Sequence, residues 1–237
     1  MYALVFYSHT DYQDVWPLLF QQTEKYIQNK NIYFLVNNPT QLIPKSWNVI
    51  LYDDKLNYQN RVSSCLEKIN EEIVIFHHED MILYDEPNQK LLENLSELVA
   101  SSEIDILKLI RAQYNDAVLE STEQENIYIN PDNLLFAIQP SICKTSKLVE
   151  IYKNTPGKTI WEFEELSNRT VRAKKIKSCC YYTGEEKKRG LFHWDSLVYP
   201  YFATAVVKGK WNFSDYMQTL KPLLKKAKVD INIRGAA

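Results

Sequence analysis

The sequence predicts an α/β fold in which helices flank a mostly parallel central sheet. Short apolar runs alternate along the chain with amphipathic segments of helical periodicity, as expected when helices connect parallel strands. Polar residues follow several of these runs, at the positions where parallel strands would end and bind ligands. With 237 residues, of which 45% are hydrophobic, the chain can bury a sizeable core.

The alternation is clearest in the first half of the chain. Continuous apolar runs predict strands that are buried on both faces, at residues 2–7, 32–36, 48–52, 73–76 and 104–110. Apolar residues three and four positions apart predict helices between them, at residues 15–27, 59–69 and 89–100. Because Pro17 is tolerated only in a first helical turn, Asp14 is the expected N-cap of the first helix.

The second half is less regular. Residues 116–126 are polar and predict a loop, and the charged segment 183–190 predicts another. The remaining patterns predict strands at 127–129, 134–138 and 174–182 and helices at 141–152, 161–168 and 214–226, with Thr159 capping the second of these helices. No internal repeat is present, so we expect a single domain over residues 1–237.

Composition excludes several classes of function. With 28 basic and 30 acidic residues, the chain has no general attraction to nucleic acid. No apolar run is long enough to span a bilayer, no signal peptide is recognisable, and the four cysteines lack metal-ligand spacing. These features predict a cytoplasmic protein. The locally basic segment 221–228 is compatible with peripheral contact to an anionic membrane, although a solvated basic helix face is the commoner explanation.

The most informative stretch is the polar cluster His77, His78, Glu79 and Asp80, which lies between two apolar runs. Burying such groups is costly unless a cation, a partner or a substrate is present. Alternation along a strand places His77 and His78 on opposite faces. We therefore expect His78 and Asp80 to face one ligand, with Glu79 and His77 on the other side. A core histidine bonded to neighbouring backbone explains His77 equally well.

Four predicted strand ends carry polar residues: Ser8–Asp11, Asp53–Asp54, residues 77–80 and residues 111–113. Their convergence predicts a binding edge. Carboxylates placed there suit a divalent cation that neutralises a diphosphate, and His78 would fit Mn²⁺ better than Mg²⁺. The chain has only 5 glycines and no glycine-rich phosphate loop, which counts against a Rossmann dinucleotide fold and a P-loop NTPase.

This layout resembles the GT-A fold glycosyltransferases, which transfer a sugar from a nucleotide-diphosphate sugar. The resemblance rests on the polar sequence that follows the first strand, on a helix that contains Arg61, and on His78-Glu-Asp80 between two apolar runs. That family carries an Asp-x-Asp motif at the last position. Asp80 matches its second, metal-binding aspartate, whereas His78 replaces the first.

The resemblance implies a nucleotide-sugar-binding half over about residues 1–113 and an acceptor half over about residues 114–237. It implies a nucleotide-diphosphate sugar donor, with UDP favoured, and a glycan or lipid-linked acceptor. Mn²⁺ or Mg²⁺ would be held by Asp80 and His78. The residues that would contact the nucleotide are Ser8, His9, Thr10, Asp11, Asp53 and Arg61.

Inverting enzymes of this family place a general base at the start of a helix that faces the acceptor. The acidic segment 159–166 is the matching candidate, with Glu164 preferred and Glu162 second. Trp161, three residues before Glu164, shares its helix face and could flank a sugar. Acidic residues also favour helix N-termini because of the helix dipole, which explains the same pattern without any catalytic role.

A third candidate region is the aromatic and basic segment 189–211. As a closing lid it would bring His193 to the metal and Lys208 or Lys210 to phosphate. Packing of the acceptor half explains its aromatic residues at least as well.

Two other functions fit the sequence. One is a metal-dependent hydrolase in which the cluster at residues 77–80 activates water, although strand alternation prevents all four groups from reaching one ion. The other is a non-catalytic relative that binds a carbohydrate or a nucleotide sugar.

Overall fold

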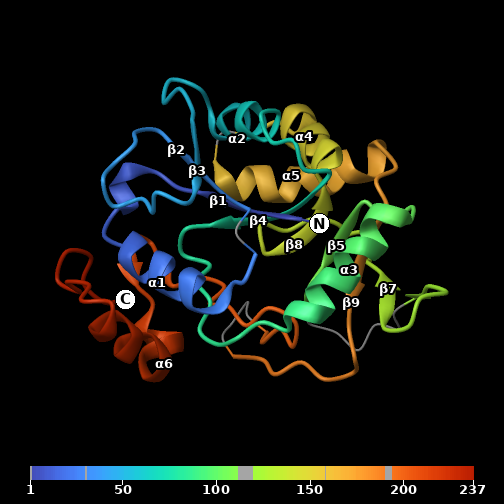
Figure 1. Ribbon diagram of the computed structural model, residues 1–237. Coiled ribbons are helices and arrows are strands. Elements are labelled where there is room, and N and C mark those ends of the chain that lie inside the picture. Colours follow the sequence, from blue (N-terminus) through green and yellow to red (C-terminus); the bar gives the residue numbers. More distant parts are fainter. Residues whose placement is uncertain (1, 30, 112–119, 158, 190–193) are drawn as a thin grey trace.

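The computed structural model describes residues 2–29, 31–111, 120–157, 159–189 and 194–237. Within these residues a nine-stranded sheet forms the centre of the molecule, in the order β3-β2-β1-β4-β8-β5-β9-β7-β6 (Figure 1). All of its strands run in one direction except β8 and β7, which pair antiparallel with their neighbours. The predicted α/β fold with a mostly parallel sheet is confirmed.

The first half follows the predicted alternation closely. Its strands are buried on both faces, apart from the edge strand β3, and they are β1 (Ala3–Tyr7), β2 (Ile32–Val36), β3 (Asn48–Leu51) and β4 (Ile73–His78). The helices are α1 (Trp16–Tyr26), α2 (Tyr58–Leu66) and α3 (Gln89–Ser101). The predicted cap at Asp14 is wrong. Val15 occupies the N-cap without a side-chain bond, because the Asp14 carboxylate is engaged by Arg234 at 2.7 Å.

The second half contains β5 (Ile106–Lys108), β6 (Glu120–Ser121), β7 (Ile127–Ile129), β8 (Ser141–Lys144), α4 (Thr145–Asn154), α5 (Ile160–Ala173) and β9 (Ser178–Tyr181). Thr159 caps α5 as predicted, accepting from the Glu162 amide at 3.1 Å. Two predictions fail here. Residues 141–144 form a strand and not a helix, because β8 fills the gap between β4 and β5 and bonds to both.

The other failure is the strand predicted at residues 134–138. These residues form an irregular segment with which no strand of the described residues pairs, and several of its backbone groups are bonded by side chains. Lys108 donates to the Leu134 carbonyl at 2.9 Å, and Asn168 accepts from the Phe136 amide at 3.1 Å. The residues predicted as a loop at 116–126 include the short strand β6, and residues 112–119 lie outside the described part of the chain.

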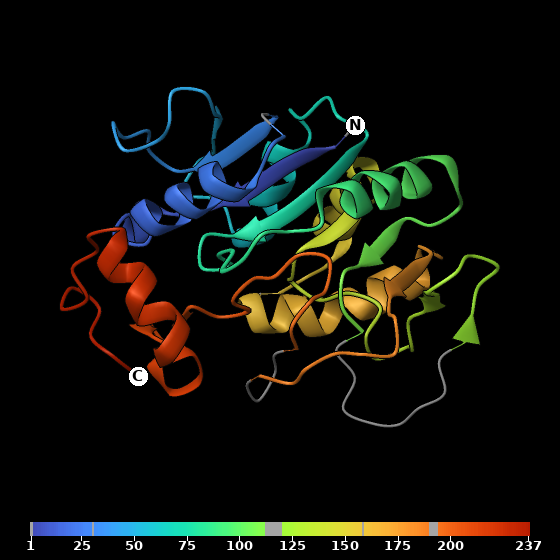
Figure 2. The ribbon, with the colours of Figure 1, turned by 60° about the horizontal axis from the view of Figure 1, so that its bottom comes forward.

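Helices cover both faces of the sheet and create two apolar cores (Figure 2). Helices α2, α4 and α5 pack on one face. Helices α1, α3 and α6 (Phe213–Lys226) pack on the other, where the hairpin of β10 (Val206–Val207) and β11 (Lys210–Trp211) precedes α6. Within the described residues, no helix has both the length and the apolar character needed to cross a membrane.

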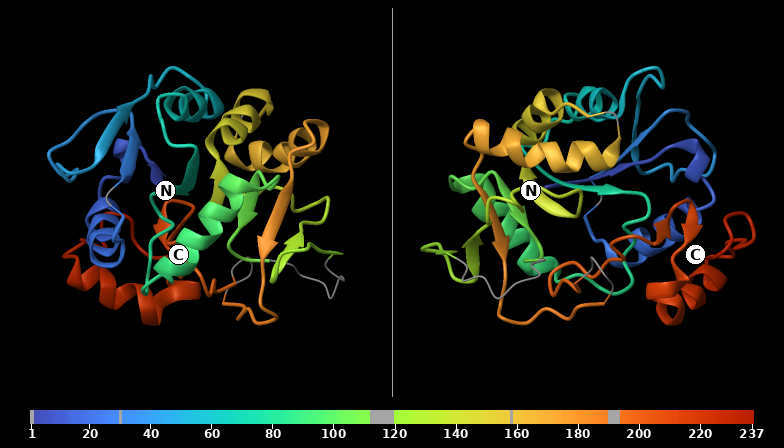
Figure 3. Two further views of the ribbon diagram at one scale, coloured as in Figure 1. Left: turned by 45° about the vertical axis from the view of Figure 1, so that its right-hand side comes forward. Right: turned by 180° about the vertical axis from the view of Figure 1, so that it is seen from behind.

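The parallel arrangement determines where the polar strand ends meet. Because β1, β2, β3, β4 and β5 all point the same way, the residues that follow them lie along one edge of the sheet. The C-terminal segment returns to this edge beside the end of β1 (Figure 3), where Arg234 donates to the Asp11 carbonyl at 2.8 Å. The candidate site is built along that edge.

Candidate functional site

A hydrogen-bonded network joins the ends of β1, β2 and β3. The backbone amide of Asp11 donates to His9 Nδ1 at 3.1 Å, so His9 Nε2 carries the proton and donates to Asp54 Oδ2, also at 3.1 Å. Thr10 and Asn37 bond reciprocally, through the Thr10 amide at 2.9 Å and the Thr10 hydroxyl at 3.0 Å. The hydrogen bond from His9 holds the pKa of Asp54 below its usual value. The network therefore presents an ionised carboxylate at the edge.

Arg61 supports this network from the first turns of α2. Its guanidinium pairs with Asp54 Oδ1 at 3.1 Å and donates to the carbonyls of Asp54 and Leu56. It also lies 5.5 Å from the centre of the Tyr52 ring. Arg61 thus lies at the predicted edge, where it is folded back on the loop that follows β3.

The remaining predicted nucleotide contacts, Ser8, Asp53 and Asp11, differ from one another in burial and in their hydrogen bonds. Ser8 is fully buried, and its hydroxyl accepts from the Trp16 indole at 2.7 Å, so it supports the edge from beneath. Asp53 is exposed and accepts from the Lys55 amide at 2.9 Å in a local turn. Asp11 is exposed at the tip of the short 3₁₀ turn η1 (Thr10–Tyr12). Asp54, not Asp53, is the carboxylate that the structure joins to the network.

The two histidines of β4 lie on opposite faces, as strand alternation predicts. His77 is buried between Phe6, with ring centres 4.7 Å apart, and Tyr199, at 5.1 Å. Among the residues that the structure describes, neither of its ring nitrogens has a hydrogen-bond partner of good geometry. Burial lowers the pKa of His77 to about 3, so the ring is neutral at physiological pH. His77 is a core residue here.

His78 takes part in a chain of polar groups on the α2/α4 side. Its Nε2 lies 2.7 Å from the Tyr58 hydroxyl, which in turn lies 3.1 Å from the Tyr152 hydroxyl. Burial lowers the pKa of His78 to about 4, so this ring is also neutral. Since Tyr58 occupies Nε2, Nδ1 is the nitrogen left to meet a ligand.

Glu79 and Asp80 lie on the other side, beneath the C-terminal segment. Asp80 accepts from the Val206 amide at 3.4 Å, and its carbonyl accepts from the Ala205 amide at 3.2 Å. Burial raises the pKa of both carboxyl groups, and for Glu79 the nearby Asp80 charge adds to the effect. Arg234 is the cation whose field opposes this rise. Two neighbouring carboxyl groups out of water favour an additional positive charge.

A divalent cation could bind beside Glu79 and Asp80 if phosphate and water completed its coordination. Within the described ranges, no three histidine, cysteine, aspartate or glutamate side chains come together to form a metal site of their own. Asp80 with Glu79 could instead supply one or two carboxylate ligands to an ion that takes its remaining oxygens from phosphate and water, as Mg²⁺ commonly does. His78 lies beside Tyr58, whereas Asp80 lies beside Val206. The two side chains that were expected to face one ligand therefore have different neighbours.

The two predicted carboxylate bases differ in their surroundings. Glu162 is exposed in the first turn of α5. Glu164 is partly buried, accepts from the Ile138 amide at 2.7 Å, and has a pKa raised by burial. Its charge contributes to the raised pKa of Tyr58, after the larger effects of burial, Tyr152 and Tyr7. Glu164 therefore belongs to the His78 side of the edge, whereas Trp161 is 78% exposed.

The lid residues remain predictions. Lys208 and Lys210 are exposed in the β10–β11 hairpin, whose turn residues Lys208 and Gly209 both have positive φ values. The hairpin is joined to the edge through Arg234, which lies 3.5 Å from the Gly209 carbonyl and bonds to the residues after β1. His193 lies outside the described residues.

Four residues of the edge were not predicted as site residues. They are Asn37, Asp54, Tyr58 and Arg234. Asp54 belongs to a strand end that the sequence did identify, but Asp53 was chosen there as the nucleotide contact. Asn37 follows β2 at a strand end, so the same rule could have found it. Tyr58 and Arg234 reach the edge only through contacts between distant parts of the chain.

No protein-family model and no curated protein sequence matches this chain. Solved structures do share its architecture. UDP-glucose pyrophosphorylase in complex with UDP-glucose aligns over 95% of this chain and 99% of its own, with 10% identity and a TM-score of 0.55. A cytidylyltransferase from Leptospira borgpetersenii aligns over 98% of this chain and 97% of its own, with 12% identity and a TM-score of 0.50.

The mannosyltransferase PcManGT from Pyrobaculum calidifontis, solved with GDP-Man and Mn²⁺, aligns over 97% of this chain with 10% identity and a TM-score of 0.52. The present chain spans 64% of the length of that mannosyltransferase. Similarity at this level of identity establishes the fold alone. The chain has the fold shared by nucleotidyltransferases and GT-A glycosyltransferases, as the sequence predicted.

Proposed function

We propose that this protein, on the fold just established, transfers a sugar from a nucleotide-diphosphate sugar to a glycan or lipid-linked acceptor. The observation that carries the proposal is the convergence of two kinds of chemistry on one sheet edge. The loops after β1, β2 and β3 supply a hydrogen-bonding network with Asp54 and Arg61. The end of β4 supplies a desolvated carboxylate pair, and α5 supplies Glu164.

The donor would lie along the ends of β1 to β4. His9, Thr10, Asp11 and Asp54 would bond the nucleoside, because their polar groups lie at the exposed end of the network. Arg61 would pair with a phosphate oxygen in addition to Asp54, since guanidinium groups bind phosphate well. A UDP-sugar is the favoured donor.

A divalent cation, Mn²⁺ or Mg²⁺, would neutralise the charge that develops on the leaving nucleoside diphosphate. Asp80, with Glu79 beside it, would hold this ion. The lysines of the β10–β11 hairpin, Lys208 and Lys210, would add positive charge near the phosphates, and His193 is a further metal ligand in this proposal.

Glu164 would take the proton from the acceptor hydroxyl, so that the oxygen attacks the anomeric carbon and inverts its configuration. The raised pKa of Glu164 suits this role, because a base with a pKa nearer neutrality accepts a proton more readily. Glu162, which is exposed in the first turn of α5, is the second choice.

Nucleotidyl transfer is the second candidate, because the chain matches nearly the whole length of the pyrophosphorylase and the cytidylyltransferase but only 64% of the mannosyltransferase. Against it, the loop after β1 contains no glycine, and the first glycine of the chain is Gly157. Backbone cradles for nucleoside triphosphates generally need glycine at such a loop. Sugar transfer therefore remains the preferred function.

Calorimetric titration of a panel of sugar nucleotides, with Mn²⁺ and with EDTA, tests the proposal. We expect at least one nucleotide-diphosphate sugar to bind more tightly with the metal. Incubating that donor with glycan and lipid-linked acceptors should release a nucleoside diphosphate, whereas a nucleotidyltransferase would release pyrophosphate from a triphosphate. If no sugar nucleotide binds in the presence of Mn²⁺, the proposal is wrong.

A further inference from the structure

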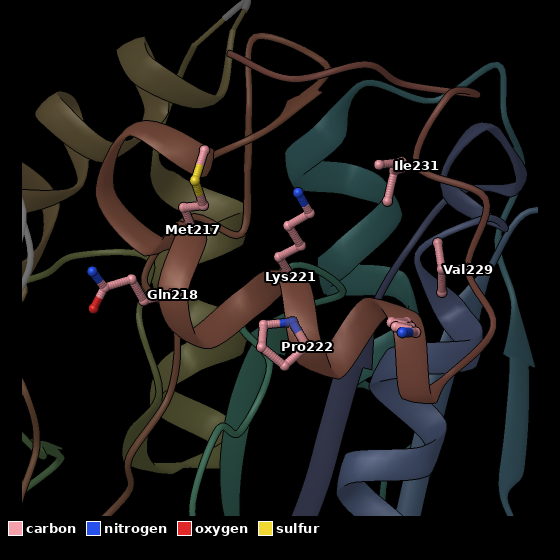
Figure 4. Close-up of a pocket in the computed structure, with 7 residues that line it drawn as sticks. Met217, Gln218, Lys221, Pro222, Val229 and Ile231 are labelled. Atoms are coloured by element: carbon pink, nitrogen blue, oxygen red, sulfur yellow. The ribbon is translucent and has the colours of Figure 1, made fainter.

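The last helix and the segment after it form an exposed groove that the proposed transfer chemistry does not use. The groove encloses about 620 Å³ and has a mainly apolar lining. Its lining residues come from two neighbouring stretches of chain (Figure 4), and they are Met217, Gln218, Lys221, Pro222, Lys225, Val229 and Ile231.

Helix geometry explains how the groove is formed. Met217, Lys221 and Lys225 are four residues apart and therefore lie on one row of α6. Leu220 and Leu224 lie on another row and are fully buried in the core. After α6, the left-handed conformation of Lys228, with φ of 57°, turns the chain back. This turn brings the residues after it alongside the helix.

The groove carries an excess of positive charge. Residues 213–237 contain five basic and two acidic side chains, in a chain whose formal net charge is −2. Both acidic groups are already engaged, since Asp215 accepts from Asn212 at 3.2 Å and Asp230 accepts from the Asn232 amide at 3.0 Å. Within the described residues, no ion pair involves any of the exposed lysines at 221, 225, 226 and 228.

Two large apolar side chains stand out from this basic surface. Met217 is 51% exposed and Ile233 is 66% exposed. Apolar side chains among unpaired lysines are typical of surfaces that lie on a membrane, where the apolar groups enter the headgroup region and the lysines meet phosphates. A single-stranded nucleic acid would require aromatic stacking residues, which the groove lining lacks.

We propose that this surface, formed by α6 and residues 227–233, binds anionic phospholipid membranes. Lys221, Lys225, Lys226 and Lys228 would contact the lipid phosphates. Met217 and Ile233 would insert beside them. Lipid binding does not depend on the transferase activity. The proposed membrane surface adjoins the candidate site, because Arg234, the residue after Ile233, is bonded to the loop after β1.

Vesicle co-sedimentation tests this proposal with the purified full chain and no sugar nucleotide. We expect binding to vesicles that contain phosphatidylglycerol, and little binding to vesicles of phosphatidylcholine alone. The double variant Lys221→Glu/Lys225→Glu should lose about tenfold or more in the partition coefficient, because each lysine near an anionic surface contributes severalfold. The control Lys45→Glu/Lys90→Glu makes the same change in net charge on exposed lysines elsewhere.

Two results would overturn the proposal: the unmodified protein fails to bind phosphatidylglycerol vesicles, or the control variant loses as much binding as the groove variant. Tighter binding to single-stranded RNA than to vesicles at equal phosphate concentration would also overturn it. Because no sugar nucleotide is present, these results leave the proposed sugar transfer unaffected, and failure of donor binding leaves the lipid result unaffected.

Insertion of the apolar groups is tested separately. All four native cysteines are buried, so a polarity-sensitive dye can be attached selectively to Met217→Cys. Its emission should shift to the blue with phosphatidylglycerol vesicles, while the same dye on Leu42→Cys, a position with 53% exposure, should not respond. Equal responses at the two positions, or none at Met217, would contradict insertion at this surface.

Discussion

The two sides of strand β4 carry different chemistry where the strand ends. On the α2/α4 side, His78, Tyr58 and Tyr152 form a chain of neutral groups that share protons, with Glu164 nearby. On the C-terminal side, charged groups meet: Glu79 and Asp80 lie in the field of Arg234. The contrast teaches that four adjacent polar residues need not form one metal site. Alternation separates His77 from His78, but β4 ends at His78, and the turn that follows carries both carboxylates to the C-terminal side.

The largest effect should come from the proposed base, Glu164, on the α2/α4 side of β4, hereafter the neutral side. Glu164→Gln keeps an oxygen that can accept from the Ile138 amide but removes the proton acceptor. We expect turnover to fall by about 10²–10⁴-fold. Donor affinity, measured by calorimetry, should remain unchanged. Glu165→Gln, an exposed position one residue further on, is the matched control.

The pH dependence of turnover gives a second measurement on the same residue. Burial raises the pKa of Glu164, and the base acts in its ionised form, so turnover should rise with pH through an inflection above the ordinary glutamate value of 4.5. Unchanged turnover in Glu164→Gln would move the base to Glu162 or elsewhere, and would break the assignment of proton transfer to the neutral side.

On the charged side, Asp80→Asn should weaken metal-dependent donor binding. The amide oxygen can still accept from Val206, but the negative charge that attracts the cation is lost. We expect donor affinity in Mn²⁺ to fall by about a hundredfold or more, with little change in EDTA. Asp53→Asn, at an exposed turn, should behave as the unmodified protein. Equal losses with and without Mn²⁺ would mean that Asp80 supports the fold and not the ion.

Lys108 is a buried cation on the neutral side, so the comparison can also be tested by measuring the free energy of unfolding. Lys108 is 1% exposed, and burial lowers its pKa from 10.5 to about 8. Between these values the unfolded chain binds more protons than the folded one, so the free energy of unfolding contributed by Lys108 rises with pH. From pH 8 to pH 10 we expect a gain of about 2 kcal/mol in the unmodified protein relative to Lys108→Met.

Denaturant unfolding of both proteins across that pH range measures the difference. Lys108→Met keeps the aliphatic chain while removing the charge. Parallel pH profiles for the two proteins would show that Lys108 keeps an ordinary pKa in the fold, and that the α2/α4 side accommodates charge as readily as the other side does.

The smallest effect concerns the hydroxyl chain itself. Removing the Tyr58 hydroxyl with Tyr58→Phe leaves both His78 and Tyr152 without their shared partner. A double-mutant cycle with Tyr152→Phe should give a coupling energy of about 1 kcal/mol in the free energy of unfolding. A coupling indistinguishable from zero would mean that the hydroxyl groups meet without stabilising each other.

The first half of the fold was predictable because its strands are continuous apolar runs joined by amphipathic helices. The second half was not, because its local patterns are overridden by distant contacts. Residues 141–144 become a strand through bonds to β4 and β5, and residues 134–138 are prevented from forming one by bonds to side chains such as Lys108. Local pattern therefore predicts elements that form by themselves and misses those that neighbours impose.

The candidate site shows the same division. Polar residues directly after strands, such as His9 and Thr10, could be placed at the edge from the strand rule alone. Tyr58 reaches His78 from another element, and Arg234 reaches Asp14 across 220 positions in the chain. No local pattern records such contacts. The choice of Asp53 over Asp54 also required the structure, because both residues follow the same strand.

The bond between Arg234 and Asp14 has a consequence for synthesis of the protein. Both side chains are about nine-tenths buried, and the bond fixes the turn that presents the first candidate residues. During translation, the first strand leaves the ribosome long before residue 234 does. In a nascent chain, the loop after β1 therefore lacks its arginine partner until residue 234 has emerged.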